Sequence, residues 1–416
     1  MQMGTNQPKI GSYNYSVVLS AIQSSDGTSR VEIAERSGLT AQTVSVIVRR
    51  LVSSGLVREE GTIPSTGGKP RTALRVVAEA GYSIGIHFDP IEVSCVLVDL
   101  AGHPVARSSK RITANLDPES LVASTARVAE QLVKRSRIDR TAILGLGAAC
   151  PGPIDQTQGL VISPPRRDRW TEVPLKKLLA EQTGLPVIID NDATAAAIGE
   201  RWAGLGRSTA NFAYLYLGTG IGGGVFLANQ VYRGASLNAA EFGHIVVEPN
   251  GPVCYCGNRG CLEAMCRPAS VVESVRSQLE AGQSSSLCES YARDPASLTT
   301  TAIGAAAAAG DPVAREVIDR VADYLADAAV VIANVLDVEL LVIGGHCLRD
   351  VGEIYRERIA EALTRLPLAR KVHTVRVALS SLTEDAAAVG AASLVFHQAY
   401  APSIADLTTD VVRQVD

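Results

Sequence analysis

Aromatic residues and long apolar runs are both scarce in this chain. Only 4% of the 416 residues are Phe, Trp or Tyr, so we expect a core built mainly from Ala, Val, Leu and Ile. No apolar run reaches the roughly 18 residues that a membrane-spanning helix needs. Nothing at the N-terminus has the pattern of a targeting peptide. These absences exclude a membrane-spanning protein and favour a cytoplasmic one.

Neither sign of charge dominates the whole chain, but the charges are unevenly distributed. The net charge is -4, whereas residues 1–76 carry nine Lys and Arg against five Asp and Glu. A basic N-terminal region on an acidic remainder predicts that only this region meets a polyanion. The length of 416 residues also predicts more than one domain.

Eight cysteines could form disulfides, as they do in small secreted domains. This chain is long, however, and five of its cysteines are scattered in apolar surroundings, which suits a reducing cytosol. These five are Cys95, Cys150, Cys266, Cys288 and Cys347. The other three lie close together and need a different explanation.

One imidazole and three thiols lie within a segment of eighteen residues: His244, Cys254, Cys256 and Cys261. Structural zinc sites fill a tetrahedral shell with four such ligands. Gly257 and Gly260 allow the sharp turns that return Cys261 to the same ion. We therefore predict structural Zn²⁺ here, with Cys266 as a possible fifth thiol that is more simply explained as buried and unbound. Two flanking carboxylates favour a small polar ligand nearby: Glu241 and Glu263.

The N-terminal region has the signals of three consecutive helices. Apolar residues first repeat at helical spacing from Tyr15 to Ile22. Ser29 and Glu32 form a capping-box pattern at the start of a second helix, which ends near Gly38. Thr40 then caps a third helix, which runs from Ala41 to about Ser54. Its buried stripe is expected to be Val44, Ile47, Val48 and Leu51.

A helix, a glycine turn and a second helix are typical of the helix-turn-helix, whose second helix enters the major groove of DNA. The exposed face of that helix predicts contacts to bases and phosphates from Thr40, Gln42, Thr43, Ser45, Val46, Arg49 and Arg50. Two strand-like runs, 56–58 and 73–77, flank a glycine-rich tip, which predicts a wing that presents Lys69 and Arg71. The alternative to DNA binding is that this three-helix module serves only for packing or for binding a partner. Dimerisation is implied, because one such module makes few DNA contacts.

The remaining chain alternates strands and helices, which predicts an α/β fold. Strands are expected at 82–88, 92–99, 142–146, 186–189, 211–217 and 340–343, and helices at 121–134 and 311–336. Glycine turns are expected after several strands, at 145–147 together with 151–153, at 218–224 and at 344–345. Such turns let backbone N–H groups approach a ligand, and three of them favour a cleft between two lobes.

With the Gly-His pair and the Cys-x-Cys-Gly-x-x-Gly-Cys-x-Glu signature at 254–263, the chain resembles the ROK family. The resemblance covers essentially the whole chain, and the N-terminal module is similar to that of the family's xylose and N-acetylglucosamine repressor branch. It implies a winged helix-turn-helix, residues 1–78 (the head), followed by a two-lobed actin-like ATPase, or ribonuclease H-like, fold at 79–416 (the body). The implied lobes are about 82–195 with helix 384–400, and about 196–383 with the zinc loop.

The resemblance also implies the residues of a sugar site. Asn191 and Asp192 match the segment that binds sugar hydroxyls, and Asp192 is the equivalent of the catalytic base in the family's kinases. Glu241, His244 and Glu263 match the other sugar contacts, so His244 is implied to touch both zinc and sugar. Carboxylates and amides suit vicinal hydroxyls, because they accept and donate hydrogen bonds.

Three departures from the family pattern separate a regulator from an enzyme. The kinases' Asp-x-Gly-Gly-Thr phosphate loop is replaced by His87-Phe88-Asp89-Pro90-Ile91. Because phosphoryl transfer depends on positioning and neutralising the phosphates, we expect poor ATP binding and no kinase activity. The segment Arg166-Arg167-Asp168-Arg169 could meet an anionic sugar or could be a solvated loop. Ala239-Ala240 stands before Glu241, where a glycine is usual.

The sequence thus predicts a sugar-responsive regulator, most simply a repressor that a sugar or sugar phosphate releases from double-stranded operator DNA. A homo-oligomer, dimer or tetramer, is expected. Two alternatives stay open: a sugar kinase with an added DNA-binding head, and a regulator controlled by a protein partner that docks on the zinc loop.

Overall fold

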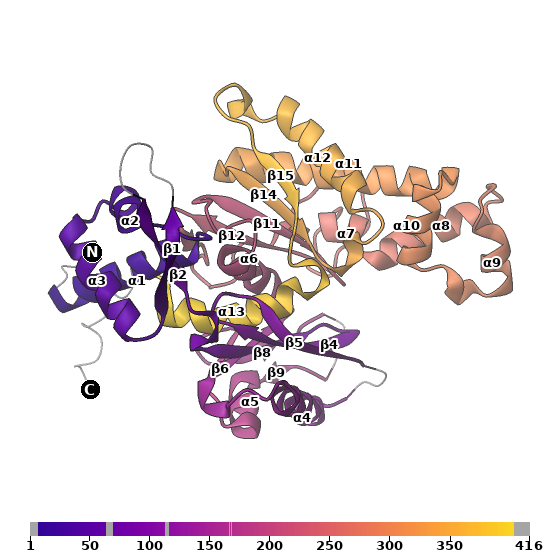
Figure 1. The fold of residues 1–416 in the computed structure, drawn as a ribbon. Helices are drawn as coiled ribbons and strands as arrows, with labels where there is room; N and C mark the ends of the chain where they lie inside the picture. The colour runs from indigo at the N-terminus through magenta and orange to yellow at the C-terminus, as the bar shows by residue number, and fades with distance from the viewer. Residues whose placement is uncertain (1–6, 64–69, 113–115, 166, 168, 403–416) are drawn as a thin grey trace.

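A computed structural model describes residues 7–63, 70–112, 116–165, 167 and 169–402 (Figure 1). The head lies at one end of the molecule, against a body of two lobes with a helical extension at the far side. Among the described residues, no helix is long and apolar enough to cross a membrane.

The head is a winged helix-turn-helix, as predicted. Its helices are α1 (Gln7–Gln23), α2 (Arg30–Ser37) and α3 (Ala41–Ser53), and an antiparallel hairpin follows, made of β1 (Val57–Ile63) and β2 (Arg71–Val76). Both sides of the Ser29–Glu32 capping box are formed. Gly38 ends α2 with φ of 71°, the left-handed conformation that glycine adopts without steric cost. The expected stripe of α3 is buried in the head's own core: Val44, Ile47, Val48 and Leu51.

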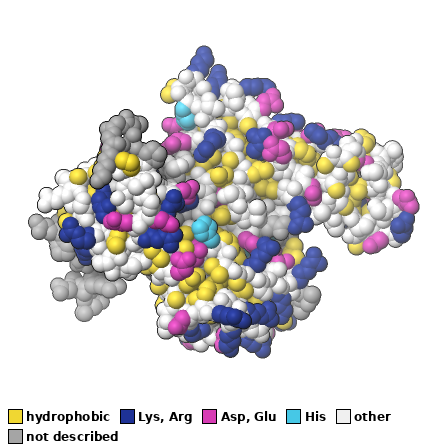
Figure 2. All heavy atoms as spheres, in the orientation of Figure 1, with side chains coloured by type: hydrophobic (Ala, Val, Ile, Leu, Met, Phe, Trp, Pro, Cys, Tyr) yellow, Lys and Arg dark blue, Asp and Glu magenta, His cyan; other side chains and the backbone are white. Residues whose placement is uncertain are grey.

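The first lobe is built on a mixed five-stranded sheet in the order β10-β6-β3-β4-β5. Its strands are β3 (Tyr82–Phe88), β4 (Glu92–Asp99), β5 (Pro104–Arg111), β6 (Ile143–Cys150) and β10 (Val187–Asn191). Helices α4 (Pro118–Ser136) and α5 (Leu175–Thr183) belong to this lobe, with a small sheet of β7 (Ile154–Asp155), β8 (Leu160–Ile162) and β9 (Glu172–Val173). Figure 2 shows Lys and Arg side chains gathered on this lobe, over α4 and α5.

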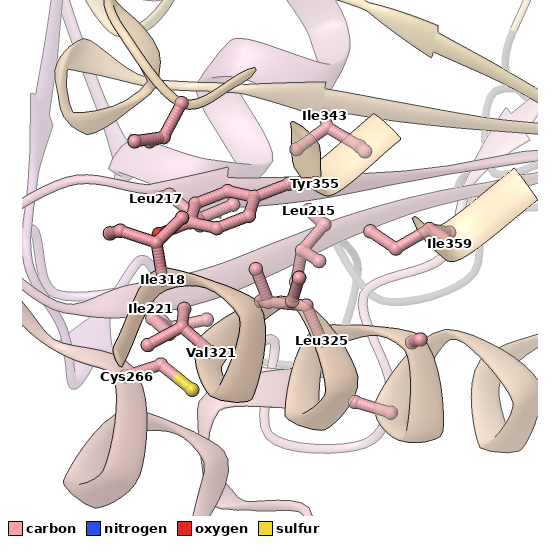
Figure 3. Close-up of a cluster of buried hydrophobic side chains, with 14 of the residues drawn as sticks. Leu215, Leu217, Ile221, Cys266, Ile318, Val321, Leu325, Ile343, Tyr355 and Ile359 are labelled. Atoms are coloured by element: carbon pink, nitrogen blue, oxygen red, sulfur yellow. The ribbon is translucent and has the colours of Figure 1, made fainter. Parts of the chain in front are cut away.

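The second lobe has its own five-stranded sheet, in the order β13-β12-β11-β14-β15. The strands are β11 (Phe212–Leu217), β12 (Ile221–Leu227), β13 (Gln230–Val231), β14 (Leu340–Gly344) and β15 (Arg376–Leu379). Helices α7 (Leu262–Cys266), α8 (Pro268–Glu280), α9 (Cys288–Arg293), α10 (Thr300–Ala308), α11 (Pro312–Leu336) and α12 (Gly352–Arg365) complete it. Cys266 lies in the apolar core between this sheet and α11, in agreement with the buried, unbound thiol expected (Figure 3).

Two helices of small residues, α6 (Asp192–Ala203) and α13 (Ala386–Tyr400), pack against each other between the sheets. Here the structure corrects the expected glycine turns. Gly145 and Gly147 lie inside β6, and a Cβ on Gly147 would collide with the carbonyl oxygen of Ala391 in α13. Of the predicted turn at 218–224, only residues 218–220 lie outside a strand, since β12 begins at Ile221. A Cβ on Gly224 would lie 2.5 Å from Cβ of Ala197 in α6. Gly147 and Gly224 therefore permit close contact between helix and sheet. Gly152 and Gly220 agree with the prediction, because they lie in bends and line a cleft between the lobes, and Gly345 follows β14 with φ of 119°.

Replacing Gly390 with Ala should destabilise the body strongly. A Cβ there would collide with the Ala195 carbonyl group of α6, and overpacking of this kind costs typically about 1–3 kcal/mol or more. Gly11→Ala is the matched control, because α1 offers open space at this position and Ala favours a helix by about 1 kcal/mol over Gly. Thermal unfolding should show a lower Tm for Gly390→Ala than for the unmodified chain, and no such decrease for Gly11→Ala. An unchanged Tm of Gly390→Ala would contradict the close packing of α6 on α13.

Candidate functional site

A cleft of about 510 Å³ lies between the two lobes of the body. Residues from both lobes line it, and they include all five side chains that the sequence assigned to a sugar: Asn191, Asp192, Glu241, His244 and Glu263. These residues are up to 72 positions apart in the chain, so the fold brings them together.

Asn191 and Asp192 are held at the point where β10 ends and α6 begins. The Asn191 carboxamide oxygen caps the helix by accepting hydrogen bonds from N–H of Ala193 at 2.9 Å and of Thr194 at 3.4 Å. This leaves the amide nitrogen of Asn191 as the group able to donate to a ligand. The Asp192 carboxylate accepts from the same N–H of Ala193 and lines the cleft.

The carboxylates of Glu241 and Glu263 reach the cleft from the second lobe. Glu263, in α7, is buried and accepts a hydrogen bond from Ile221 N–H at 2.8 Å. Glu241 is exposed to solvent as a whole residue, but its carboxylate lies among the cleft walls. Desolvation there raises the pKa of Glu241 to about 7, with repulsion from Asp192 and Glu263 adding to the effect. The cleft thus concentrates carboxylate acceptors, which suits a ligand with many hydroxyls.

The four predicted metal ligands converge on one point beside the cleft. The ligand atoms of His244, Cys254, Cys256 and Cys261 all lie within 4.8 Å of one another. Sγ of Cys256 is 3.7 Å from Sγ of Cys261, and Sγ of Cys254 is 3.6 Å from Nδ1 of His244. With bonds of about 2.3 Å to sulfur and 2.0 Å to nitrogen, a tetrahedral ion needs ligand separations of about this size. The residues therefore fit a metal ion.

His244 divides its two ring nitrogens between the cluster and the cleft. Nδ1 faces the thiol of Cys254, while Nε2 lies 3.1 Å from the hydroxyl of Tyr255, which also lines the cleft. A metal on Nδ1 would fix the tautomer and leave Nε2 as a hydrogen-bond donor toward the cleft.

Replacing Cys254 with Ser should remove the metal. The purified protein is expected to carry about one Zn²⁺ per chain, and the variant to carry almost none, as measured by elemental analysis. Cys288→Ser is the control, because Cys288 lies outside the cluster. Equal zinc contents in the two variants would contradict the metal site.

The segment His87–Ile91, which the sequence predicted to stand in place of a kinase phosphate loop, is held by its own interactions. His87 is buried, with Nε2 3.7 Å from an Asp192 carboxylate oxygen. The Asp89 carboxylate accepts hydrogen bonds from Ile91 N–H at 2.8 Å and from the Thr219 hydroxyl of the other lobe at 2.7 Å. A carboxylate fixed at this position would repel an anion.

The other two departures also have structural outcomes. Arg167 is buried, stacks over the Trp170 ring at 4.9 Å and donates to the backbone oxygen of Asp89 at 2.7 Å. It is neither a solvated residue nor part of the cleft lining; Arg166 and Asp168 lie outside the described residues. Ala240 adopts φ of 68°, which explains why glycine is usual near this position.

Sequence reasoning missed several residues of the cleft. Tyr216, Thr219, Asn238, Tyr255 and Arg267 also line it. Asn238 additionally ties the lobes together, because its side chain bonds both the N–H and the carbonyl oxygen of Ile154. Tyr255 stands inside the cysteine signature and Thr219 inside the glycine turn predicted at 218–224, so both had a sequence signal. Tyr216, Asn238 and Arg267 had none, since only the folding of two lobes aligns them.

The predicted DNA-contacting residues of α3 lie on the face opposite its buried stripe. Thr40, Gln42, Val46, Arg49 and Arg50 are exposed, while Thr43 and Ser45 are half-buried. Thr40 caps the helix by accepting from Thr43 N–H, and Arg50 lies over the Tyr15 ring. Arg71 begins β2, whereas Lys69 of the wing lies outside the described residues. The visible face of the head carries side chains of both charges (Figure 2).

Two family patterns match the chain. That of the ROK family matches residues 83–398, which include both lobes, the cleft and the cysteine cluster. That of a winged helix-turn-helix DNA-binding family matches residues 17–58, which include α2 and α3.

Named relatives include both repressors and kinases. The chain is 29% identical over 391 residues to a putative xylose repressor of Caldicellulosiruptor sp. (strain Rt8B.4), covering 94% of this chain and 97% of the relative. It is 38% identical over 269 residues to a glucokinase of Thermotoga maritima, covering 65% of this chain and 84% of the relative. A solved ROK family transcriptional regulator, a homologue of the Escherichia coli Mlc protein, superposes with a TM-score of 0.75 at 24% identity, covering 94% of this chain and 97% of that one; this likeness concerns the fold.

Proposed function

The chain belongs to the ROK family, and we propose that it is a sugar-responsive transcriptional repressor. In this proposal the head binds double-stranded operator DNA, and a sugar bound in the cleft releases it. The observation that carries the proposal is the union of a DNA-binding head and a polar cleft in one chain. The near full-length likeness to a putative xylose repressor supports it.

The chemistry of the cleft supports a carbohydrate ligand. Asp192, Glu241 and Glu263 offer acceptors, Asn191 and His244 offer donors, and each vicinal hydroxyl of a sugar needs both. Tyr216 and Tyr255 supply aromatic surface for the apolar faces of a sugar ring. The volume of about 510 Å³ lies within the range of small-molecule sites.

Zn²⁺ is the metal that best fits the cluster, because three thiols and one imidazole form a closed shell of its preferred ligands. Bound zinc would supply structural rigidity, and no position is left open for catalysis. His244, Cys254, Cys256 and Cys261 would hold it. This arrangement would fix His244 and Tyr255 at the cleft wall and so support sugar recognition.

Helix α6 offers a direct connection between the cleft and the head. It begins with Asp192 in the cleft and extends 12 residues, a length of about 18 Å at 1.5 Å per residue. At its other end, the carbonyl oxygen of Trp202 accepts a hydrogen bond from Gln23 of α1. Because α6 is buried along nearly all its length, a shift at Asp192 on sugar binding would be transmitted to the head.

A sugar kinase is the competing function, since the chain also resembles a glucokinase. The phosphate-loop segment argues against it: Pro90 lacks an N–H donor, and the Asp89 carboxylate occupies the segment. Asp192 then serves as a sugar ligand and not as a catalytic base.

A homo-oligomer, dimer or tetramer, would place two heads on neighbouring half-sites of the operator.

Replacing Asp192 with Ala should abolish release from DNA by sugar while leaving DNA binding intact. We expect at least tenfold weaker sugar binding, because one charged hydrogen-bonding group contributes about 1.5–3 kcal/mol. Calorimetry with candidate sugars and a DNA mobility shift measure the two effects. Glu181→Ala, an exposed carboxylate on α5, is the control.

A variant at Asp192 that responds fully to sugar would overturn the assignment of the cleft. The same preparations should form no phosphorylated sugar with Mg-ATP. Sugar phosphate produced by the unmodified chain, and lost on Asp192→Asn, would instead identify a kinase.

Replacing Gln42 with Ala should weaken operator binding and relax its sequence preference. A side chain paired to one base contributes about 1–3 kcal/mol of discrimination. Arg49→Ala should weaken binding to all DNA sequences alike, since we assign it to phosphate. Binding curves on operator and unrelated DNA separate these effects, with Lys177→Ala on α5 as the control for loss of a cation. Unchanged affinity in both head variants would contradict the DNA-binding face.

A further inference from the structure

A second cavity, of about 330 Å³, lies between the head and the body. Helices α1 and α2 of the head form one side, and the end of α6, the β12–β13 turn and the end of α13 form the other. In Figure 1 the head adjoins this end of α13. The cavity is separate from the sugar cleft: no residue lines both.

The charged side chains that line this cavity are two arginines, and its one histidine is neutral. Arg36 of α2 and Arg201 of α6 line it together with His397 of α13, and no Asp or Glu is among the lining residues. Burial and the nearby charge of Arg36 lower the pKa of Arg201 to about 10. Burial, with repulsion from Arg233 and Arg201, lowers the pKa of His397 to about 3. Arg36 and Arg201 are therefore the two positive charges of this cavity, and an anion bound between them would be stabilised by both.

Other arginines near this junction already have carboxylate partners. Arg207 pairs with Asp26 at 3.2 Å, and Arg233 pairs with Asp190 at 2.7 Å. Arg201 donates only to backbone oxygens, those of Gly206 and Arg207. Within the part of the chain that the structure describes, no carboxylate pairs with Arg36 or Arg201. One cation from the head and one from the body thus face a shared space without a counter-charge.

The remaining lining residues suit a small organic anion. Tyr13, Asn14 and Asn229 bring polar groups, while Trp202 and Leu39 provide apolar surface. The volume falls at the lower end of the range of small-molecule sites, large enough for a monosaccharide-sized ligand but not for a protein segment of any length.

We propose that this cavity binds a phosphorylated small metabolite, whose phosphate bridges Arg36 of the head and Arg201 of the body. Guanidinium groups bind phosphate through paired, charge-assisted hydrogen bonds. Such a ligand would fix the head against the body beside the contact of Gln23 with Trp202. Because Arg201 and Asp192 lie on the same helix, the anion and the sugar would be energetically coupled, each changing the affinity of the other by the same factor.

Inorganic phosphate is the probe for this site, titrated into the full-length protein at constant ionic strength set with chloride. The unmodified chain should bind one phosphate and unfold at higher temperature in its presence, since a ligand of the folded state stabilises it. Arg36→Gln should weaken phosphate binding at least tenfold. Arg36 is exposed, so this variant should fold normally. Arg30→Gln on the same helix is the control, because Arg30 pairs with Glu59 and does not line the cavity.

Without sugar present, Asp192→Ala should still bind one phosphate although it has lost a sugar ligand, which separates this site from the sugar cleft. Glucose 6-phosphate and glucose are then compared as ligands of Asp192→Ala. If the cavity recognises the phosphate group, glucose 6-phosphate should bind to this variant and glucose should not. Equal phosphate affinity in the unmodified chain and in Arg36→Gln would overturn the proposal, even if the sugar response of the cleft were intact. The proposal would also be overturned if Arg30→Gln weakened the affinity for phosphate as much as Arg36→Gln does.

Discussion

The close packing of α6 against α13 between two sheets is the constraint on which the rest of the molecule depends. Both helices are rich in alanine, and glycines on the facing strands leave no side chain between backbone and backbone. Dispersion contacts at this distance are numerous, and any added methyl group must displace main chain. As a result α6 has a fixed position, which sets Asp192 at the cleft and Trp202 at the head.

The cleft and the metal cluster illustrate a second constraint, the cost of gathering like charges. Asp192, Glu241 and Glu263 converge on one space, and desolvation, together with repulsion from the other two carboxylates, raises the pKa of Glu241. Such an arrangement is unfavourable in an empty protein, and polar ligands or nearby cations offset it. The head–body cavity presents the opposite sign, with Arg36 and Arg201 among its lining residues. The chain therefore holds two spaces of complementary ligand preference, one at each end of α6.

Local signals in the sequence were reliable where a short segment contains its own cause. The capping box at Ser29, the left-handed turn at Gly38 and the buried stripe of α3 each depend on residues a few positions apart. The cysteine cluster is also local, and its ligand atoms converge as the spacing predicted. Gly147 and Gly224 were wrongly predicted to lie in turns, because their role does not depend on neighbouring residues of the sequence. A glycine in a loop and a glycine packed against a helix have the same local pattern. Only the position of the partner helix shows that these two belong to the second kind.

The sequence by itself determined the head, the α/β class and the metal cluster, because capping, periodicity and ligand spacing act over a few residues. It also provided the five side chains assigned to the cleft, through their resemblance to the ROK family. Only the tertiary structure decided that His87 faces Asp192, that Asp89 is tied to Thr219, and that Arg36 and Arg201 line one cavity. These pairs join residues 105 to 165 positions apart. They come together because two lobes and a head pack around α6, an arrangement that no local pattern encodes.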